Sequence, residues 1–128
     1  MDPVQHFELP CNDVARARKF YGDAFGWNLF EVGNGYLFAG TVEMEQGGRP
    51  KKVGAINGAL VPKGGVNQAP VLFVRVANLA EACRKVALAG GAVVGEPITM
   101  PGAGTLRHVR DTEGTVLALW EQMPAPSN

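Results

Sequence analysis

The sequence predicts an α+β fold in which a strand–helix–three-strand module occurs twice within 128 residues. The first observation is a repeat: the pattern HFELPCNDVARARKFYGDAFGWNL, starting at His6, returns 65 positions later as VLFVRVANLAEACRKVALAGGAVV, starting at Val71. The second is that each copy carries a short strand pattern followed by apolar residues at helical spacing. The third is the composition, with 46% apolar and 19% charged residues, which is typical of a folded chain and not of a disordered one.

Two helices of about 12 residues are predicted at equivalent places in the two copies. Asp13 and Asn78 precede them, and both side chains can accept hydrogen bonds from the unpaired N–H groups of a first helical turn. Gly26 and the pair Gly90–Gly91 stand where the helical patterns end. The apolar stripes that define the helices are Val14, Ala17, Tyr21 and Ala24 in the first copy, and Leu79, Ala82, Val86 and Ala89 in the second.

The predicted strands follow the same order in both copies. In the first copy they lie at 4–9, 27–32, 36–43 and 53–61, with a Gly33-Asn34-Gly35 hairpin turn. In the second copy they lie at 71–76, 92–100, 105–110 and 115–121. The segment 62–69 contains Pro and two Gly and is predicted to link modules 4–61 and 70–122. Because each module alone is small, we expect one domain over residues 1–128.

Charge and composition exclude several classes of function. The formal net charge is zero, which gives no electrostatic attraction for nucleic acid or for an anionic membrane. No apolar run approaches the roughly 20 residues of a membrane span, and no signal-peptide pattern opens the chain. Two cysteines do not make a disulfide framework, so Cys11 and Cys83 are expected as small buried hydrophobes in a cytoplasmic protein.

Three motifs carry a family resemblance. HFELPCNDVARARKFYGDAFGW is similar to the opening of glyoxalase-related proteins, and VGAINGALVP resembles their Gly-Ile-Asn-Gly strand. RDTEGTVLALWE resembles their Asp-Pro-x-Gly-Asn turn and the following Leu-Trp-Glu strand, with Thr112 and Thr115 replacing Pro and Asn. From about residue 4 to 122 the chain thus resembles the vicinal oxygen chelate superfamily, which includes glyoxalase I, bleomycin-resistance proteins, fosfomycin-resistance enzymes and extradiol dioxygenases.

The resemblance implies that tandem βαβββ modules form a curled mixed β-sheet cup, flanked by two helices, that binds a small molecule. In metal-dependent relatives, the first and last strands of each module supply four ligands to a divalent ion. His6 falls at the first position, but Val71 and Ala118 fall where two other ligands are needed. The fourth position lies near Ile56–Ala59, where only Asn57 offers an oxygen. Because a catalytic zinc site needs about three protein ligands, we expect no metal or other cofactor, and His6 as a ligand only if a site exists.

His6 is the best candidate for catalysis, because a neutral imidazole facing a pocket can exchange a proton near pH 7. Glu8 shares its face of the strand and either orients His6, binds a ligand hydroxyl, or is solvated at the rim. Each candidate also has a packing or ion-pair interpretation, which the sequence leaves open. The remaining ligand-binding candidates are aromatic side chains for stacking, an amide and two guanidinium groups: Trp27, Tyr36, Phe73, Trp120, Asn57, Arg75 and Arg107.

The choice between Arg107 and His108 depends on the turn DTEG. If that turn has four residues, Arg110 pairs with Thr115 and Arg107 with Ala118. Arg107 then points into the cup and His108 away from it, whereas a slip of one residue reverses the two. We favour Arg107.

Two functional hypotheses follow from the sequence. The first is a protein that binds a small organic molecule in a metal-free cup, in the manner of bleomycin-resistance proteins. The second is an enzyme, a lyase or isomerase related to lactoylglutathione lyase, or a dioxygenase, that uses His6 with or without a divalent metal. A homodimer is expected, because members of this family commonly pair module edges or exchange modules, and open sheet edges invite pairing.

Overall fold

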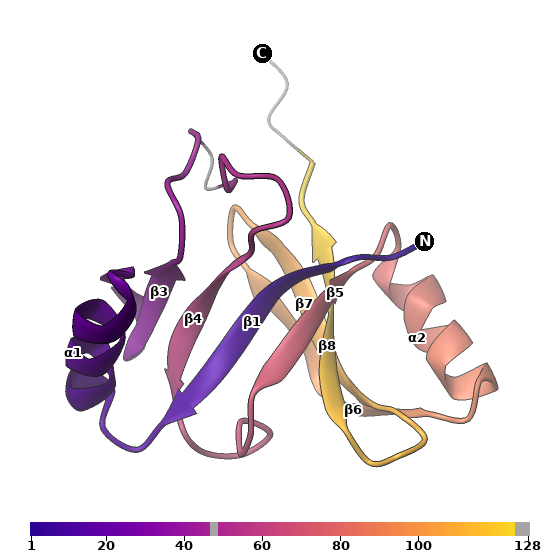
Figure 1. The fold of residues 1–128 in the computed structure, drawn as a ribbon. Helices are drawn as coiled ribbons and strands as arrows, with labels where there is room; N and C mark the ends of the chain where they lie inside the picture. Colours follow the sequence, from indigo (N-terminus) through magenta and orange to yellow (C-terminus); the bar gives the residue numbers. More distant parts are fainter. Residues whose placement is uncertain (47–48, 125–128) are drawn as a thin grey trace. The chain divides into compact units, whose positions relative to one another are not determined.

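The structure, a computed structural model, describes residues 1–46 and 49–124. The chain divides into two compact units: residues 5–71, and residues 1–4 together with the chain from residue 72 onward. The first and second modules described below coincide with these units except at Val4 and Val71, which are the first residues of two strands. Within the described residues each module contains one helix and four strands in the order strand, helix, three strands (Figure 1). The predicted α+β class and the βαβββ repeat are therefore confirmed.

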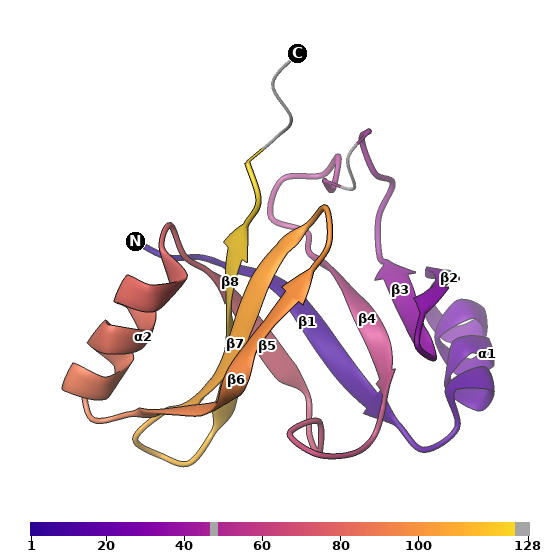
Figure 2. The same cartoon turned by 180° about the vertical axis from the view of Figure 1, so that it is seen from behind.

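The first module comprises β1 (Val4–Cys11), α1 (Val14–Phe25), β2 (Asn28–Gly33), β3 (Tyr36–Gly40) and β4 (Asn57–Pro62). Its strands lie in the order β2-β3-β4-β1, with β1 parallel to β4 and the other pairs antiparallel. The second module comprises β5 (Val71–Arg75), α2 (Leu79–Leu88), β6 (Ala92–Met100), β7 (Gly104–Arg110) and β8 (Val116–Gln122). Its order is β5-β8-β7-β6, and β5 and β8 are the parallel pair (Figure 2).

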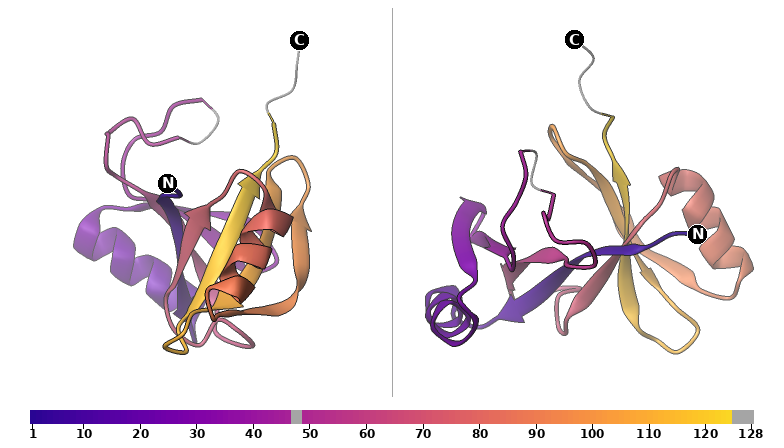
Figure 3. Two further views of the ribbon diagram at one scale, coloured as in Figure 1. Left: turned by 90° about the vertical axis from the view of Figure 1, so that its right-hand side faces the viewer. Right: turned by 45° about the horizontal axis from the view of Figure 1, so that its top comes forward.

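Each helix covers one face of the strands of its own module (Figure 3). The core of each module lies between its helix and its strands. Side chains at alternate strand positions supply this core, as the period of two requires. In the first module the buried members are Cys11, Leu29, Leu37, Ala39 and Leu60, with Val14, Ala17 and Tyr21 of α1 packed against them. In the second they are Val76, Leu79, Cys83, Val109 and Leu119. Both cysteines are buried and free, as predicted.

Helix α1 begins and ends as the sequence predicts. The Asp13 side chain accepts a hydrogen bond of 3.0 Å from the Arg16 backbone N–H. At the other end Gly26 has φ +70°, a left-handed conformation that is costly for other residues, and its N–H donates to Gly22 O. Both ends of the helix are thus satisfied by local chemistry.

Asp13→Ala is expected to lower the free energy of unfolding by about 1 kcal/mol, because the first turn of α1 loses its side-chain acceptor. The measurement is urea denaturation followed by circular dichroism. Asn12→Ala, at the exposed neighbouring position, serves as the control and is expected to change stability by less than about 0.5 kcal/mol. Equal losses in the two variants would contradict the capping role.

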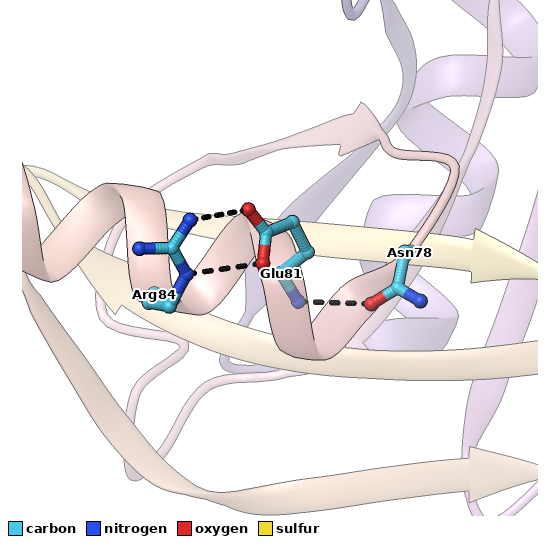
Figure 4. A network of polar contacts seen from close by, with 3 residues as sticks. All are labelled: Asn78, Glu81 and Arg84. Atoms are coloured by element: carbon cyan, nitrogen blue, oxygen red, sulfur yellow. Dashed lines mark hydrogen bonds and ion pairs between the residues drawn. The ribbon is translucent and has the colours of Figure 1, made fainter.

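Helix α2 is capped by Asn78, whose side chain accepts from the Glu81 backbone N–H at 2.9 Å. The Glu81 carboxylate does not complete a capping box; it accepts two hydrogen bonds from the Arg84 guanidinium one turn later (Figure 4). A second acceptor comes from β8, where Glu121 Oε1 receives the Leu79 backbone N–H at 2.8 Å. Glu121 therefore lies on the α2 side of its strand, as alternation from Ala118 predicts.

Several strand ends differ from the prediction. The third strand ends at Gly40 and not at residue 43, and the fourth begins at Asn57 and not at residue 53. Between them the chain turns at residues 51–54, where Ala55 N–H donates to Lys52 O and Gly54 has φ +87°. The Gly33–Gly35 hairpin turn occurs as predicted, with positive φ at Asn34 and Gly35. No helix among the described residues is long and apolar enough to cross a membrane.

Candidate functional site

The first module has a sheet face turned away from α1, and this face gathers four of the predicted site residues. The strand register pairs His6 with Asn57, Glu8 with Ala59, and Phe38 with Ala59. Paired residues share a face, and the intervening positions Leu37, Ala39 and Leu60 point into the helix-side core. We call this surface the open face of the first module, defined by His6, Glu8, Phe30, Tyr36, Phe38, Asn57 and Ala59.

Glu8 is a buried carboxyl on the open face. Its exposed fraction is 7%. Burial disfavours the charged form, and it raises the pKa of Glu8 from 4.5 to about 7. The sequence interpretation of a solvated rim residue is therefore wrong for Glu8, while its sharing of a face with His6 is confirmed.

Asn57 is buried beside His6, and its side-chain orientation is fixed by Thr41, the residue that follows β3. The backbone N–H of Thr41 donates to Asn57 Oδ1 at 2.9 Å, and because that N–H can only donate, the amide oxygen must face it. The Thr41 hydroxyl donates to Ile56 O at 2.7 Å and lies 3.2 Å from Asn57 Oδ1. The Asn57 Nδ2 atom is left buried, with no hydrogen-bond acceptor among the described residues. The two N–H donors of Asn57 are thus unused, while its oxygen is engaged by Thr41.

His6 lies on β1 opposite Asn57, and burial lowers the pKa of its imidazole to about 4. The ring is therefore neutral near pH 7, as the candidate role in proton exchange requires. Its ring lies 6.4 Å from that of Phe7, centroid to centroid. Position and charge state fit the prediction, while a catalytic role for His6 stays a prediction.

Aromatic side chains complete the open face. The rings of Phe30 and Phe38 stack with centroids 5.1 Å apart. Tyr36, half-buried on the same side of β3, has its pKa raised by burial and also by the negative charge of Glu8. Phe30, Phe38 and Thr41 were not among the sequence candidates. The alternation of β3 could have indicated Phe38, whereas the role of Thr41 depends on a contact across sixteen residues.

Trp27 lies apart from these residues. Its ring stacks on Tyr21 of α1 at 5.0 Å and packs against Phe7 and Phe25. Trp27 thus belongs to the helix-side core of the first module. The sequence leaves ligand stacking and core packing open for Trp27, and its position fits core packing.

In the second module the predicted choice between Arg107 and His108 is wrong. His108 pairs with Ala118, and Arg107 pairs with Leu119 of the α2-side core. The reason is the turn: Asp111 Oδ1 accepts from the N–H groups of Glu113 and Thr115, so that residues 111–115 form a five-residue connection. Arg110 consequently pairs with Val116, one residue later than expected. Arg107 instead donates to Gly95 O at 3.0 Å.

The other candidates of the second module share the face turned away from α2. Phe73 pairs with Ala118 and Arg75 with Trp120, so all four lie on the His108 side. Phe73 is buried and Arg75 is exposed. The Trp120 ring lies across Gly104, where an added Cβ would be 2.8 Å from Trp120 Cζ2. His108 is buried, its pKa is lowered by burial, and its Nε2 has no partner among the described residues.

Two shallow hollows occur outside the open face. One of about 350 Å³ lies beside the start of α1 and is lined by residues including Asp13, Arg16 and Tyr21. The other, of about 290 Å³, lies beside Arg75 and Gln122. Neither hollow contains Glu8, Asn57 or His6.

Within the first module, the described side chains do not supply the ligands of a catalytic metal site. The oxygen of Asn57 is engaged by the Thr41 backbone N–H, and the remaining Nδ2 atom carries only N–H donors, which cannot be metal ligands. The last-strand positions are alanines in both modules, Ala59 opposite Glu8 and Ala118 opposite Phe73. His6 and Glu8 leave the first module short of the three protein ligands of a catalytic site. No group of three His, Cys, Asp or Glu residues suited to a metal occurs in the described part of the chain.

Comparison with known proteins settles the family. The model of the Glyoxalase/Bleomycin resistance protein/Dioxygenase superfamily matches residues 4–119. The chain belongs to this superfamily. A glyoxylase-like domain-containing protein of Didymella fabae is 28% identical over 122 residues, which cover 91% of each protein. The resemblance predicted from the three sequence motifs is confirmed.

Solved structures show the same fold at low sequence identity. Methylmalonyl-CoA epimerase from Mycobacterium tuberculosis is 20% identical, with a TM-score of 0.64 over 96% of this chain and 88% of that chain. A Streptomyces coelicolor methylmalonyl-CoA epimerase in complex with 2-nitronate-propionyl-CoA is 15% identical, with a TM-score of 0.69 over 98% of both chains. A superfamily member from Vibrio splendidus is 12% identical, with a TM-score of 0.64 over 96% of this chain and all of that chain.

Proposed function

We propose that this superfamily member binds a small organic molecule on the open face of its first module without a metal ion. The observation that carries the proposal is Asn57 Nδ2, a buried donor with no acceptor among the described residues. An unpaired buried polar group costs about 1–3 kcal/mol, and a ligand oxygen would remove that cost. Glu8 adds a second buried polar group on the same face.

The surroundings of these two groups suit an organic guest. Phe30, Phe38 and Tyr36 provide aromatic surface beside Glu8, and small-molecule sites combine apolar walls with a few placed polar groups. The superfamily relative from Streptomyces coelicolor holds an organic ligand, which is consistent with such a role. The expected partner is therefore a small molecule.

A thermal-shift screen tests binding. A ligand that binds only the folded state adds about 2.7 kcal/mol to the free energy of unfolding when its concentration is one hundred times its dissociation constant. The melting temperature rises accordingly. We expect hits among uncharged aromatic compounds, and the hits should weaken in Asn57→Asp, which keeps an oxygen for Thr41 N–H but loses both donors. Glu31→Gln, at an exposed carboxyl of β2, is the control. Absence of stabilisation across a broad library would contradict the proposal.

Elemental analysis tests the absence of a metal. Protein purified without chelators is expected to hold far less than one equivalent of zinc, nickel, manganese or iron, because too few ligands are present. The control is the double variant Val71→His with Ala118→Glu, which restores side chains at two positions where metal-dependent relatives carry ligands. Stoichiometric metal in the unmodified protein would contradict the proposal and favour the alternative.

That alternative is a lyase, isomerase or dioxygenase that uses His6. It is kept because the imidazole is neutral near pH 7 and lies on the open face beside Glu8. Turnover of a carbonyl substrate that is lost in His6→Gln, while ligand binding is retained, would establish it. The homodimer and the cytoplasmic location also stay predictions; light scattering measures the first.

A further inference from the structure

The Asn57 amide can only donate a hydrogen bond to a ligand, because its oxygen is already engaged. Its oxygen is held by the Thr41 backbone N–H, so the buried Nδ2 atom is the half that remains for a guest. The exposed fraction of Asn57 is 4%, and water therefore has little access to these N–H groups. Whatever atom of a ligand lies here must be a hydrogen-bond acceptor.

The Glu8 carboxyl is the second fixed point of the same face. Glu8 pairs with Ala59, two residues along β4 from Asn57, and this places the two Cα atoms about 8 Å apart. Two side chains that extend from such positions can both reach one functional group of a guest. Above its pKa of about 7 the Glu8 carboxyl is ionised. A carboxylate accepts hydrogen bonds and does not donate them, so above this pH Glu8 requires a ligand donor beside the ligand acceptor that Asn57 binds.

The open face contains no positive charge that could hold an anion. Neither lysine nor arginine occurs among its residues, and the ionisable neighbours of Glu8 within the module are His6 on β1 and Tyr36 on β3. Burial keeps His6 neutral near pH 7. Above pH 7, where Glu8 is ionised, a carboxylate or phosphate placed here would meet a like charge, and like charges in a buried site repel strongly.

We propose that the ligand group bound on this face is uncharged and carries an acceptor oxygen next to an N–H or O–H donor, as in a carboxamide or lactam. The oxygen accepts from Asn57 Nδ2, and the N–H or O–H donates to Glu8. This ligand class rests on the proposed binding function and narrows it. Ligands that would place a carboxylate on this face are excluded, and Glu8 is the residue that disfavours their binding.

Matched pairs of probes test the ligand class. Benzamide and benzoate share one ring and differ in charge and donor, and N,N-dimethylbenzamide keeps the acceptor but has no donor. Further amide and acid pairs on larger aromatic scaffolds extend the set, with binding measured by ligand-observed NMR at about pH 8.5, where Glu8 is ionised. In the wild-type protein we expect each amide to bind at least about tenfold more tightly than its acid and its dimethylamide.

Variants assign the preference to the two residues. In Glu8→Gln the affinity of the acid probe is expected to rise at least about tenfold, because the negative charge is removed while the size of the side chain is kept. In Asn57→Asp the amide is expected to lose about tenfold or more. Glu31→Gln, an exposed carboxyl on the other side of the sheet, is expected to leave every ratio unchanged. Circular dichroism confirms that each variant is folded. The ratio of amide to acid affinity in the wild-type protein tests the ligand class even if a variant does not fold.

The outcomes separate the two proposals. Tighter binding of the acids than of the amides overturns the ligand class and leaves the binding function standing. Equal ratios in wild type and Glu8→Gln also overturn the role of Glu8. If no member of any pair binds the wild-type protein and a broad library gives no stabilisation either, both proposals fall.

Discussion

Glu8→Gln is expected to raise the free energy of unfolding by about 2–3 kcal/mol at about pH 8 and to leave it nearly unchanged at about pH 4.5. The reason is the burial of Glu8, which raises the pKa of the carboxyl from 4.5 to about 7. Glutamine resembles the protonated carboxyl in size and polarity, so the variant mimics the form that the folded protein prefers.

The direction follows from proton binding. Between pH 4.5 and about 7 the unfolded chain has released the Glu8 proton while the folded protein retains it. Stability therefore falls as pH rises through this interval, and the full penalty is present above it. Glutamine carries no such penalty. The difference between variant and wild type should thus grow from pH 4.5 to about 7 and stay constant above.

His6 produces the opposite slope, which makes the wild-type profile informative. Burial lowers the pKa of His6 from 6.5 to about 4, so the unfolded chain binds a proton in this interval that the folded protein does not. The contribution of His6 to stability is lost as pH falls from 6.5 to 4. In the wild type the two slopes largely cancel between pH 4.5 and 6.5. Glu8→Gln should expose the rise with pH that His6 causes.

Urea denaturation at several pH values measures both profiles. Glu31→Gln is the matched control, since the same substitution at an exposed position should give no pH-dependent difference. A stability gain of Glu8→Gln that is the same at pH 4.5 and pH 8 would show that Glu8 does not titrate with a raised pKa in the folded protein.

The module repeat and its helices could be predicted from the sequence because their signals are local. Asp13, Asn78 and Gly26 lie within a few residues of the helix ends that they cap. The apolar stripes of α1 and α2 likewise depend only on spacing along the chain. Such features do not require knowledge of which strands pair.

The register of β7 and β8 could not be predicted with the same security. The prediction assumed a four-residue turn, whereas the hydrogen bonds of Asp111 to Glu113 and Thr115 define a five-residue connection. One added residue moves every side chain of the strand to the opposite face. This is why His108 and not Arg107 lies on the Ala118 side.

The sequence could predict which candidate residues share a strand face, but it could not predict the orientation of the Asn57 amide. Alternation along β1 placed Glu8 with His6, and the motif in β4 indicated Asn57. Which half of the Asn57 amide meets a ligand depends on Thr41, sixteen residues away, and this contact leaves no local pattern in the sequence. Asn57 was considered as an oxygen donor, and the structure turns it into an N–H donor.

Gly58→Ala is expected to lower the free energy of unfolding by about 3 kcal/mol, because a methyl group that clashes with backbone atoms can be accommodated only if the backbone moves. Gly58 pairs with Phe7 across the parallel strands β4 and β1. A Cβ at Gly58 would lie 2.5 Å from Phe7 Cε2 and 2.5 Å from Phe7 O. The ring cannot simply turn aside, because it also packs against Trp27 at 5.8 Å. The strands must therefore move apart.

Gly64→Ala is the matched control, because the added Cβ meets no atom within 4 Å and Gly64 does not have positive φ. Its stability is expected to change by less than about 1 kcal/mol. Gly58→Ala should also weaken the binding of amide probes, since the pairing of β1 with β4 sets the spacing between Glu8 and Asn57. If the two glycine variants are equally stable in urea, the close packing of Phe7 on Gly58 is wrong, and with it the strand spacing that brings the carboxyl and the amide to one ligand.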